Sequence, residues 1–204
     1  MKKEIAFFDF DGTITRVDTL LAFIRFVHGT NAFLRGFLRH SPFLVAYRLK
    51  LINNQLAKEK ILTHFFKGME LTSFRDNCTR FAVEVLPGLI RPAAMAEMDR
   101  LKKSGAIIVV VSASPENWIL DWAKENQVEL IASQLEVKEG KLTGKILGRN
   151  CHGQEKVRRI MEQYDIKDYD VVHAYGDTAG DRPMLSLASM AHYKPFRNHT
   201  EIKK

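Results

Sequence analysis

Residues 4–15 read EIAFFDFDGTIT, and this stretch decides the fold that the rest of the chain completes. It begins as a short apolar run rich in phenylalanine, and Asp9, Asp11 and Gly12 end that run. A short apolar segment bounded by glycine is typical of a strand buried on both faces of a parallel sheet. The stretch therefore predicts a buried strand whose carboxyl end carries Asp9 and Asp11, which share one face because they are two residues apart.

The segment that follows has a different period. Between residues 18 and 86, apolar side chains recur every three or four positions, as at Leu20, Phe23 and Val27. This spacing predicts a set of amphipathic helices that interrupts the sheet directly after its first strand. We expect residues 18–86 to form a helical cap domain.

From residue 87 onward, β-branched runs alternate with helical segments. Residues 106–114, AIIVVVSAS, read as a strand covered on both faces, and residue 115 is a proline that can open the next helix. Residues 134–147 alternate around a glycine, which is a hairpin signature. We expect an α/β fold with a doubly wound, Rossmann-like parallel sheet, a small β-hairpin and a short C-terminal tail; residues 1–17 and 87–204 would form its core domain.

Polar side chains gather where the predicted strands end. In an open parallel sheet, ligands bind beyond the carboxyl ends of the strands, so these side chains should meet at one edge. Together they suit phosphoryl transfer to a carboxylate, because a cation and a lysine can neutralise the phosphate while one aspartate attacks and the other moves a proton. The residues in question are Asp9, Asp11, Thr13, Ser112, Ser114, Lys156, Gly176, Asp177 and Asp181.

Four motifs of this set resemble those of the haloacid dehalogenase-like (HAD) superfamily, whose members are mostly phosphatases. They are DFDGT, VVVSAS, the lysine of CHGQEK and GDTAGD, in that order along nearly the whole chain. The resemblance implies Asp9 as the nucleophile and Asp11 as the general acid and base, and the second aspartate argues against a dehalogenase. It also implies a Mg²⁺ site and a phosphate site. The metal ligands would be Asp9, Asp11 and Asp177, supported by Asp181 and Thr178, and the phosphate would bind Gly12, Thr13, Ser112, Ala113 and Lys156.

The position of the helical insertion resembles the cap of the phosphoserine phosphatase-like branch. Within that branch, LIASQ, the hairpin and the CHGQEK segment look closer to hydrolases related to phosphatidylglycerophosphatase C. The chain reads SASPEN where phosphoserine phosphatases usually place glycines, and Asp18 stands where they usually place a glutamate. We therefore expect a phosphomonoester substrate, either a small phosphorylated metabolite or a lipid phosphate, with Asp18 and Arg25 as cap residues that could contact it.

Two other functions use the same residues and stay open at this point. A phosphotransferase would pass the phosphoryl group from Asp9 to an acceptor alcohol instead of water. A phosphate-dependent binding or signalling module would be phosphorylated but would turn over little. Receiver domains are modules of this kind, but they normally lack both a helical insertion and a residue equivalent to Asp11.

The composition narrows the partners. Lys and Arg outnumber Asp and Glu by 31 to 24, so the net charge of +7 favours anionic ligands. The two cysteines show no paired spacing, no run approaches the ~18 apolar residues of a membrane span, and no nucleic-acid recognition motif is visible. We expect a cytoplasmic protein that binds Mg²⁺ and no nucleic acid; its oligomeric state is not indicated.

The basic cap also raises the question of a membrane. Residues 33–52, FLRGFLRHSPFLVAYRLKLI, interleave large apolar side chains with arginines and could lie on the inner face of an anionic bilayer. We favour the simpler interpretation that the apolar stripes pack helix against helix and the cations are solvated.

Overall fold

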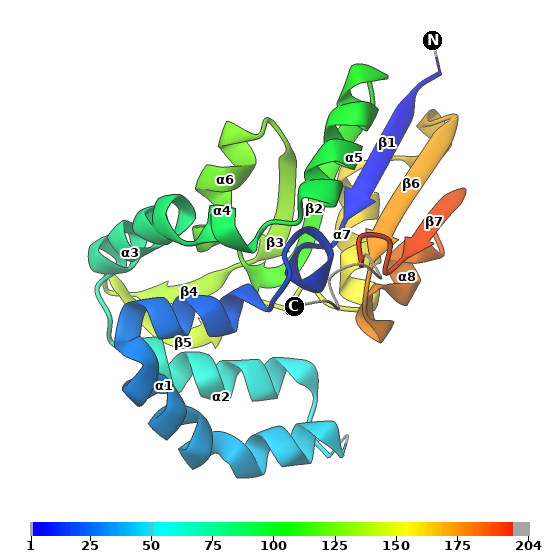
Figure 1. Cartoon of the computed structure of the whole chain (residues 1–204). Coiled ribbons are helices and arrows are strands. Elements are labelled where there is room, and N and C mark those ends of the chain that lie inside the picture. Colours follow the sequence, from blue (N-terminus) through cyan, green and yellow to red (C-terminus); the bar gives the residue numbers. More distant parts are fainter. Residues whose placement is uncertain (1, 50, 198–204) are drawn as a thin grey trace, which may run out of the picture.

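Strand β1, Glu4–Phe8, lies in the middle of the sheet, as its apolar sequence predicts. The structure is a computed structural model that describes residues 2–49 and 51–197. β1 pairs in parallel with β2, Ile107–Pro115, on one side and with β6, Val171–Gly176, on the other. The outer strands are β3, Glu129–Ser133, and β7, Met190–Tyr193, so the order is β3-β2-β1-β6-β7 with all five strands parallel (Figure 1).

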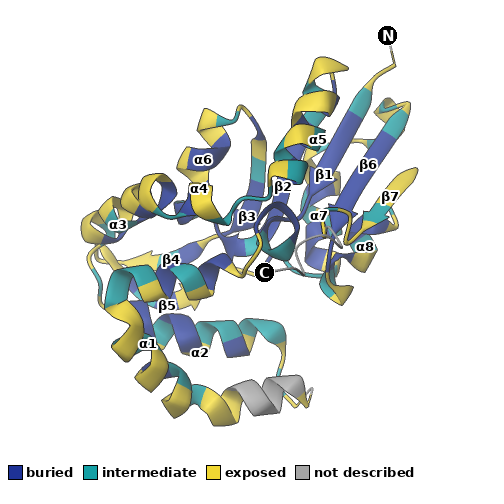
Figure 2. Cartoon of the chain, in the orientation of Figure 1, coloured by how far each residue is buried: buried dark blue, intermediate teal, exposed yellow. Residues whose placement is uncertain are grey.

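Both faces of the sheet are covered, which explains why the strands are apolar throughout rather than alternating. Ala6 and Phe8 face a cluster that includes α5, Pro92–Lys103, and α6, Leu120–Glu125. Ile5 and Phe7 face the opposite cluster with α7, Gln154–Gln163, and α8, Arg182–Leu185. Figure 2 shows the inner strands as almost entirely buried. The predicted doubly wound α/β fold is thus confirmed.

The insertion after β1 is helical, as its spacing predicts. It comprises α1, Thr19–Arg48, α2, Asn54–Phe66, and α3, Leu71–Glu84, and the short α4, Leu86–Leu89, leads back to the sheet. Gly29, with φ of +76°, breaks α1 into two arms that point in different directions. Phe23 stacks on Trp118 with ring centroids 4.7 Å apart, which joins the insertion to the loop after β2.

The predicted hairpin forms from β4, Leu135–Lys138, and β5, Lys141–Ile146. Both turn residues, Glu139 and Gly140, have positive φ, as a tight two-residue hairpin turn requires. The hairpin lies within the segment predicted as the core, yet β5 attaches to the insertion. Leu142 donates its N–H to the carbonyl of Met69 at 3.0 Å and accepts the N–H of Gly68 at 2.8 Å.

Gly144 of this hairpin packs directly against α2. It has φ of +79°, and a Cβ at this position would lie 2.4 Å from the Cα of Thr63. We expect Gly144→Ala to lower the free energy of unfolding by about 2–4 kcal/mol, because it adds both backbone strain and a clash with a main chain. Gly148→Ala is the matched control, since Gly148 also has positive φ (+73°) but nothing within 4 Å. Equal losses in urea unfolding of the two variants would contradict the proposed contact.

Two details of the second half of the chain differ from the expectation. Pro115 is the last residue of β2, and the helical segment begins one residue later, as a 3₁₀ helix over Glu116–Trp118 that leads into α6. Residues 190–193, which were expected only as part of a short C-terminal tail, form edge strand β7. β7 has only four residues, most of them exposed, so its sequence shows neither an apolar run nor a clear alternation.

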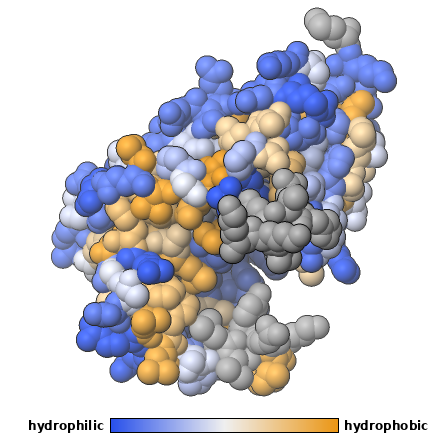
Figure 3. Space-filling model, in the orientation of Figure 1, coloured by the Kyte–Doolittle hydropathy of each residue, from blue (hydrophilic) through white to orange (hydrophobic). Residues whose placement is uncertain are grey.

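The second arm of α1 has one face against α2 and one face exposed. Phe33 and Phe37 are partly buried and pack against the core cluster, with Phe37 close to the ring of Phe65 in α2. Leu34 and Leu38 lie on the exposed side, where Figure 3 shows orange, apolar side chains on this part of the cap. Packing of helix against helix therefore accounts for only part of the apolar residues in the basic stretch at residues 33–52. Among the described residues, no helix combines the length and apolar character needed to cross a bilayer.

Candidate active site

The carboxyl edge of the sheet holds a pocket of about 590 Å³ between the strands and the insertion. Segments far apart in the sequence meet there because parallel strands all end at the same edge. Five predicted site residues with charged side chains line it together: Asp9, Asp11, Lys156, Asp177 and Asp181. The predicted Gly12, Ala113, Thr178 and Asp18 line it as well.

Asp9 and Lys156 form the buried centre of the pocket. The Nζ of Lys156 lies 2.6 Å from Oδ1 of Asp9 and 2.7 Å from Oδ1 of Asp181, and the lysine is only 1% exposed. Thr13 is also buried and donates its hydroxyl to Oδ2 of Asp9 at 3.1 Å. Burial, offset only in part by Lys156, raises the pKa of Asp9 to about 7. Burial opposes the charge of Lys156 too, but Asp9 and Asp181 together raise its pKa.

Asp11 is held between the insertion and the sheet. Its Oδ1 accepts the N–H of Thr19 at 2.7 Å and the hydroxyl of Thr19 at 2.6 Å, while its Oδ2 accepts the hydroxyl of Ser114 at 2.5 Å. The indole N–H of Trp118 donates to the Thr19 hydroxyl at 3.1 Å. Because Thr19 begins α1, the orientation of the Asp11 carboxylate depends on how the insertion sits on the core.

Asp177 follows β6 and faces the turn after β1. Gly12 has φ of +82°, and a Cβ there would lie 2.4 Å from Oδ2 of Asp177, so the close approach of these two segments requires glycine. One oxygen of Asp177, Oδ1, is buried without a hydrogen-bond partner among the described residues. Burial raises the pKa of Asp177, although the charge and hydrogen bond of Arg197 oppose this.

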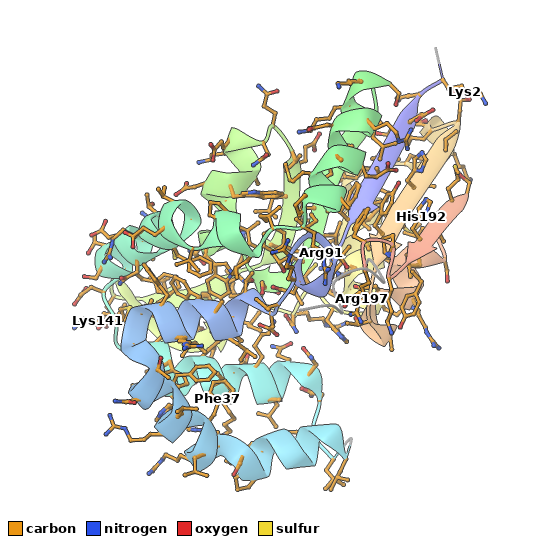
Figure 4. The ribbon with its side chains drawn as sticks, in the orientation of Figure 1. Lys2, Phe37, Arg91, Lys141, His192 and Arg197 are labelled. Atoms are coloured by element: carbon orange, nitrogen blue, oxygen red, sulfur yellow. The ribbon has the colours of Figure 1, made fainter. Side chains whose placement is uncertain are left out.

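Arg197 belongs to the segment after β7, and its guanidinium lies 2.6 Å from Oδ2 of Asp177. This segment is held at the site by Phe196, whose ring stacks on that of Tyr175 at 5.6 Å and whose carbonyl accepts from Arg91 at 3.4 Å. Figure 4 shows Arg91 and Arg197 converging on the turn after β1. Arg197 was not predicted as a site residue.

Two further predicted site residues differ in position. Ser112 is fully buried, and its hydroxyl accepts the N–H of Ser114 at 3.0 Å, so it shapes the carboxyl end of β2 from beneath. Its direct contact with a phosphate stays a prediction. Thr178 donates its hydroxyl to Oδ2 of Asp181 at 2.7 Å and so helps to fix the carboxylate that pairs with Lys156.

The two predicted cap contacts are separated in the structure. Asp18 lines the pocket, and desolvation there, together with the negative charge of Asp11, raises its pKa to about 6. Arg25 does not line this pocket; it lines a neighbouring apolar cavity, which Asp18 borders as well, and it donates to the hydroxyl of Thr30 at 3.1 Å. Arg25 lies seven residues beyond Asp18, about 10 Å along the helix, which places it outside the catalytic pocket.

The insertion also contributes residues that the sequence analysis missed. Lys58 of α2 reaches across the pocket and donates to the carbonyl of Ala113 at 3.0 Å. Desolvation lowers its pKa, although Asp18 and Asp11 favour its charged form. Asn54, from the start of α2, and His152, from the loop before α7, complete this side. His152 lies four residues before Lys156 in the sequence, and no motif marks Lys58 or Asn54.

Glu155 anchors the start of α7 and thereby positions Lys156. Its buried carboxylate accepts from Arg158 and, at 3.0 Å, from Arg159, which also donates to the carbonyl of Ala132 at the end of β3. The hydrogen bond from Arg158 is the main cause that lowers the pKa of Glu155 to about 2. A carboxyl group whose pKa is lowered by folding stabilises the folded state at pH values above its unfolded pKa of about 4.5. This stabilisation is lost as the pH falls towards 2.

We expect Glu155→Gln to lower the free energy of unfolding by about 1–2 kcal/mol at neutral pH, a figure reduced because Arg158 is half exposed. The difference from the wild type should shrink steadily below about pH 4.5. Glu162→Gln is the control, because Glu162 is an exposed partner of the same Arg158. A loss at Glu155 that stays constant down to about pH 3 in urea unfolding would contradict the ionic anchor.

Comparison with known proteins agrees with this arrangement. A family model described as haloacid dehalogenase-like hydrolase matches residues 6–186. The chain belongs to the haloacid dehalogenase-like hydrolases. Its prediction as a HAD-type enzyme is therefore confirmed.

Individual relatives of this HAD hydrolase are similar over most of its length. Protein CicA of Caulobacter vibrioides is 34% identical over 192 residues, which span 93% of this chain and 85% of CicA. A solved structure of a protein of unknown function from Bordetella pertussis Tohama I has a TM-score of 0.79 at 18% identity and covers 95% of this chain and 89% of that one. Apo phosphoserine phosphatase has a TM-score of 0.66 at 19% identity, covering 92% and 84%. At these identities the two structures show the fold alone.

Proposed function

We propose that this HAD hydrolase is a Mg²⁺-dependent phosphatase that acts on a phosphomonoester through a phosphorylated Asp9. The observation that carries the proposal is the pairing of Asp9 with Lys156 at 2.6 Å in a pocket that Asp11 also lines. A buried carboxylate next to a buried ammonium can approach a phosphate without the full repulsion between negative charges. The fold shared with phosphoserine phosphatase supports this reaction class.

The residues present fit a divalent cation. Carboxylate oxygens of Asp9, Asp177 and Asp181 lie within 4.8 Å of one another, and Oδ1 of Asp177 is buried without a partner among the described residues. Hard oxygen donors of this kind suit Mg²⁺. We assign Asp9 and Asp177 as the side-chain ligands, with the backbone carbonyl of Asp11 as a third and Asp181 in support. When bound, the cation would neutralise charge on the phosphate.

The side chains of the pocket have separate roles in the two steps of the proposed reaction. A carboxylate oxygen of Asp9 attacks phosphorus, the bond to the leaving oxygen breaks, and Asp11 donates the proton that the leaving alkoxide takes up. Asp11 then removes a proton from a water molecule, which attacks phosphorus, releases inorganic phosphate and restores the Asp9 carboxylate. Lys156 stays charged throughout, because Asp9 and Asp181 raise its pKa.

Residues 18–86 would act as the cap that selects the leaving group. Asp18 and Lys58 place one negative and one positive charge opposite Asp9, so the leaving group should carry polar or charged substituents. The substrate class would be a small phosphorylated metabolite or a lipid phosphate in the cytoplasm. Transfer to an acceptor alcohol would use the same residues and differs only in the final nucleophile.

The proposal is tested by measuring phosphate release from a panel of phosphomonoesters. Serine phosphate, sugar phosphates, nucleotides and phosphatidylglycerophosphate should be compared with added Mg²⁺ and with EDTA. We expect release from at least one member that needs Mg²⁺, and an added alcohol that takes up the phosphoryl group would reveal the transferase. Stable phosphorylation of the protein without turnover on any member would instead support the binding module.

A further inference from the structure

The positive charge of the protein is concentrated in one part of the chain. Residues 19–69 contain eight lysines and arginines and a single acidic residue, Glu59, which gives them a formal charge of +7. This equals the net charge of the entire chain, so the other residues carry equal numbers of both signs. The excess of positive charge is therefore concentrated in this part of the insertion, and the two signs balance over the rest of the chain.

The same segment exposes large apolar side chains. We call residues 30–60, the second arm of α1 together with the first half of α2, the basic arm. Leu34 and Leu38 are 58% and 77% exposed, and Leu49 and Leu51, in the turn between the helices, are 64% and 73% exposed. Leu34 and Leu38 are four residues apart, so they form one stripe on the helix surface.

Cations lie next to this apolar stripe. Arg35 and Arg39 are both exposed and repeat the same four-residue spacing one position further along. Among the described residues, neither arginine has an acidic partner within salt-bridge distance, and Lys60 of α2 lies over the ring of Phe43 with its Nζ 5.5 Å from the centroid. A leucine stripe beside an arginine stripe is the pattern of a helix that lies in a membrane interface.

Packing inside the protein does not use this outer face. On its inner face, the second α1 arm packs closely against α2 at Gly36, where a Cβ would lie 2.2 Å from the ring of Phe65. Phe33 and Phe37 also face inward, with their rings 4.5 Å apart. Phe33 and Phe37 are therefore turned away from the surface that carries Arg35 and Arg39, whereas Phe43 is 40% exposed and its ring lies under the Nζ of Lys60.

We propose that the basic arm docks on the surface of a lipid bilayer that contains anionic lipids. Leu34 and Leu38 would enter the boundary between headgroups and acyl chains, and Arg35 and Arg39 would meet the lipid phosphates. Charge complementarity selects this partner, because the basic arm carries six lysines and arginines against one acidic residue, which favours an anionic surface, and its exposed leucines favour a surface with an apolar interior. Asn54 and Lys58 of α2 line the catalytic pocket, so docking would hold that pocket near the membrane.

Vesicle binding tests the proposal without any substrate, so its outcome is independent of the proposed phosphatase activity. The protein should sediment with vesicles of phosphatidylcholine and phosphatidylglycerol, and less with phosphatidylcholine alone. We expect Leu34→Ser/Leu38→Ser and Arg35→Gln/Arg39→Gln each to weaken binding at least about tenfold, and added salt to weaken the wild type. All four positions are exposed, so unfolding curves should be unchanged.

Matched controls use equally exposed residues elsewhere. Val83→Ser/Met161→Ser removes two apolar side chains that are 73% and 61% exposed, and Lys103→Gln/Lys124→Gln removes two exposed cations from the core. Both controls should bind vesicles like the wild type. The proposal is overturned if phosphatidylglycerol does not increase vesicle binding by the wild type, or if both arm variants bind vesicles as strongly as the wild type. It is also overturned if the control variants lose as much vesicle binding as the arm variants. Binding to polyglutamate but not to vesicles would assign the arm to an acidic protein partner instead.

Discussion

Asp9→Asn is expected to lower phosphate release from the preferred phosphomonoester by at least about 10⁴-fold, because an amide cannot form the bond to phosphorus. Asparagine fills the same volume as aspartate, and its carbonyl oxygen can still accept the hydrogen bond from Lys156. The variant should therefore fold and should bind substrate while losing turnover. Initial rates at saturating substrate and Mg²⁺ measure the effect.

The stability of the same variant provides a second, independent readout. Because burial raises the pKa of Asp9 to about 7, the folded protein holds this proton more tightly than the unfolded chain does. Ionisation of Asp9 therefore lowers the free energy of unfolding, and this loss grows as the pH rises from about 4 to 7. In EDTA, Asp9→Asn should be at least as stable as the wild type at neutral pH and should match it below about pH 4.

Asp99→Asn is the control for the change in charge, because Asp99 is exposed on α5 and lies outside the pocket. It should keep wild-type turnover. A rate for Asp9→Asn within tenfold of the wild type would rule out Asp9 as the nucleophile, and a second carboxylate of the pocket would have to take that role.

The convergence of the central residues could be predicted because the sheet imposes it. Asp9 and Asp177 directly follow strongly apolar strands and Ser112 lies near the carboxyl end of another, and parallel strands must end at a common edge. Lys156 could be placed because it begins the helix between two of these strands. Periodicity and strand topology together were sufficient for this part of the site.

The rest of the pocket depends on how separate parts of the chain sit on the sheet. Lys58 reaches the pocket because α2 packs on the hairpin and crosses the carboxyl edge, and Arg197 reaches it because Phe196 stacks on Tyr175. Neither contact leaves a periodic signal. The exposure of Leu34 and Leu38 could not be predicted for a related reason. The sequence pattern marks four residues alike as apolar, namely Phe33, Leu34, Phe37 and Leu38, but the single partner helix covers only one side of this set.

Lys156→Met is expected to lower the free energy of unfolding by about 3–5 kcal/mol at neutral pH and to abolish phosphate release. The lysine is almost fully buried between Asp9 and Asp181, so its removal leaves two buried carboxylates without their cation. Burial disfavours the charge on Asp181, but in the wild type Lys156 and the hydrogen bonds from Thr178 lower its pKa. Urea unfolding in EDTA, which keeps a divalent cation from replacing the ammonium, measures the loss.

The pH dependence separates this effect from a simple change in packing. Without Lys156, both carboxylates should hold protons more tightly in the folded state, so the variant should lose stability as the pH rises and approach the wild type in acid. Lys156→Met/Asp181→Asn should recover part of the loss because it removes one of the uncompensated charges, whereas Lys103→Met, at an exposed position on α5, should cost nothing measurable. A loss below about 1 kcal/mol, or one that does not change with pH, would mean that the ammonium is not what balances Asp9 and Asp181.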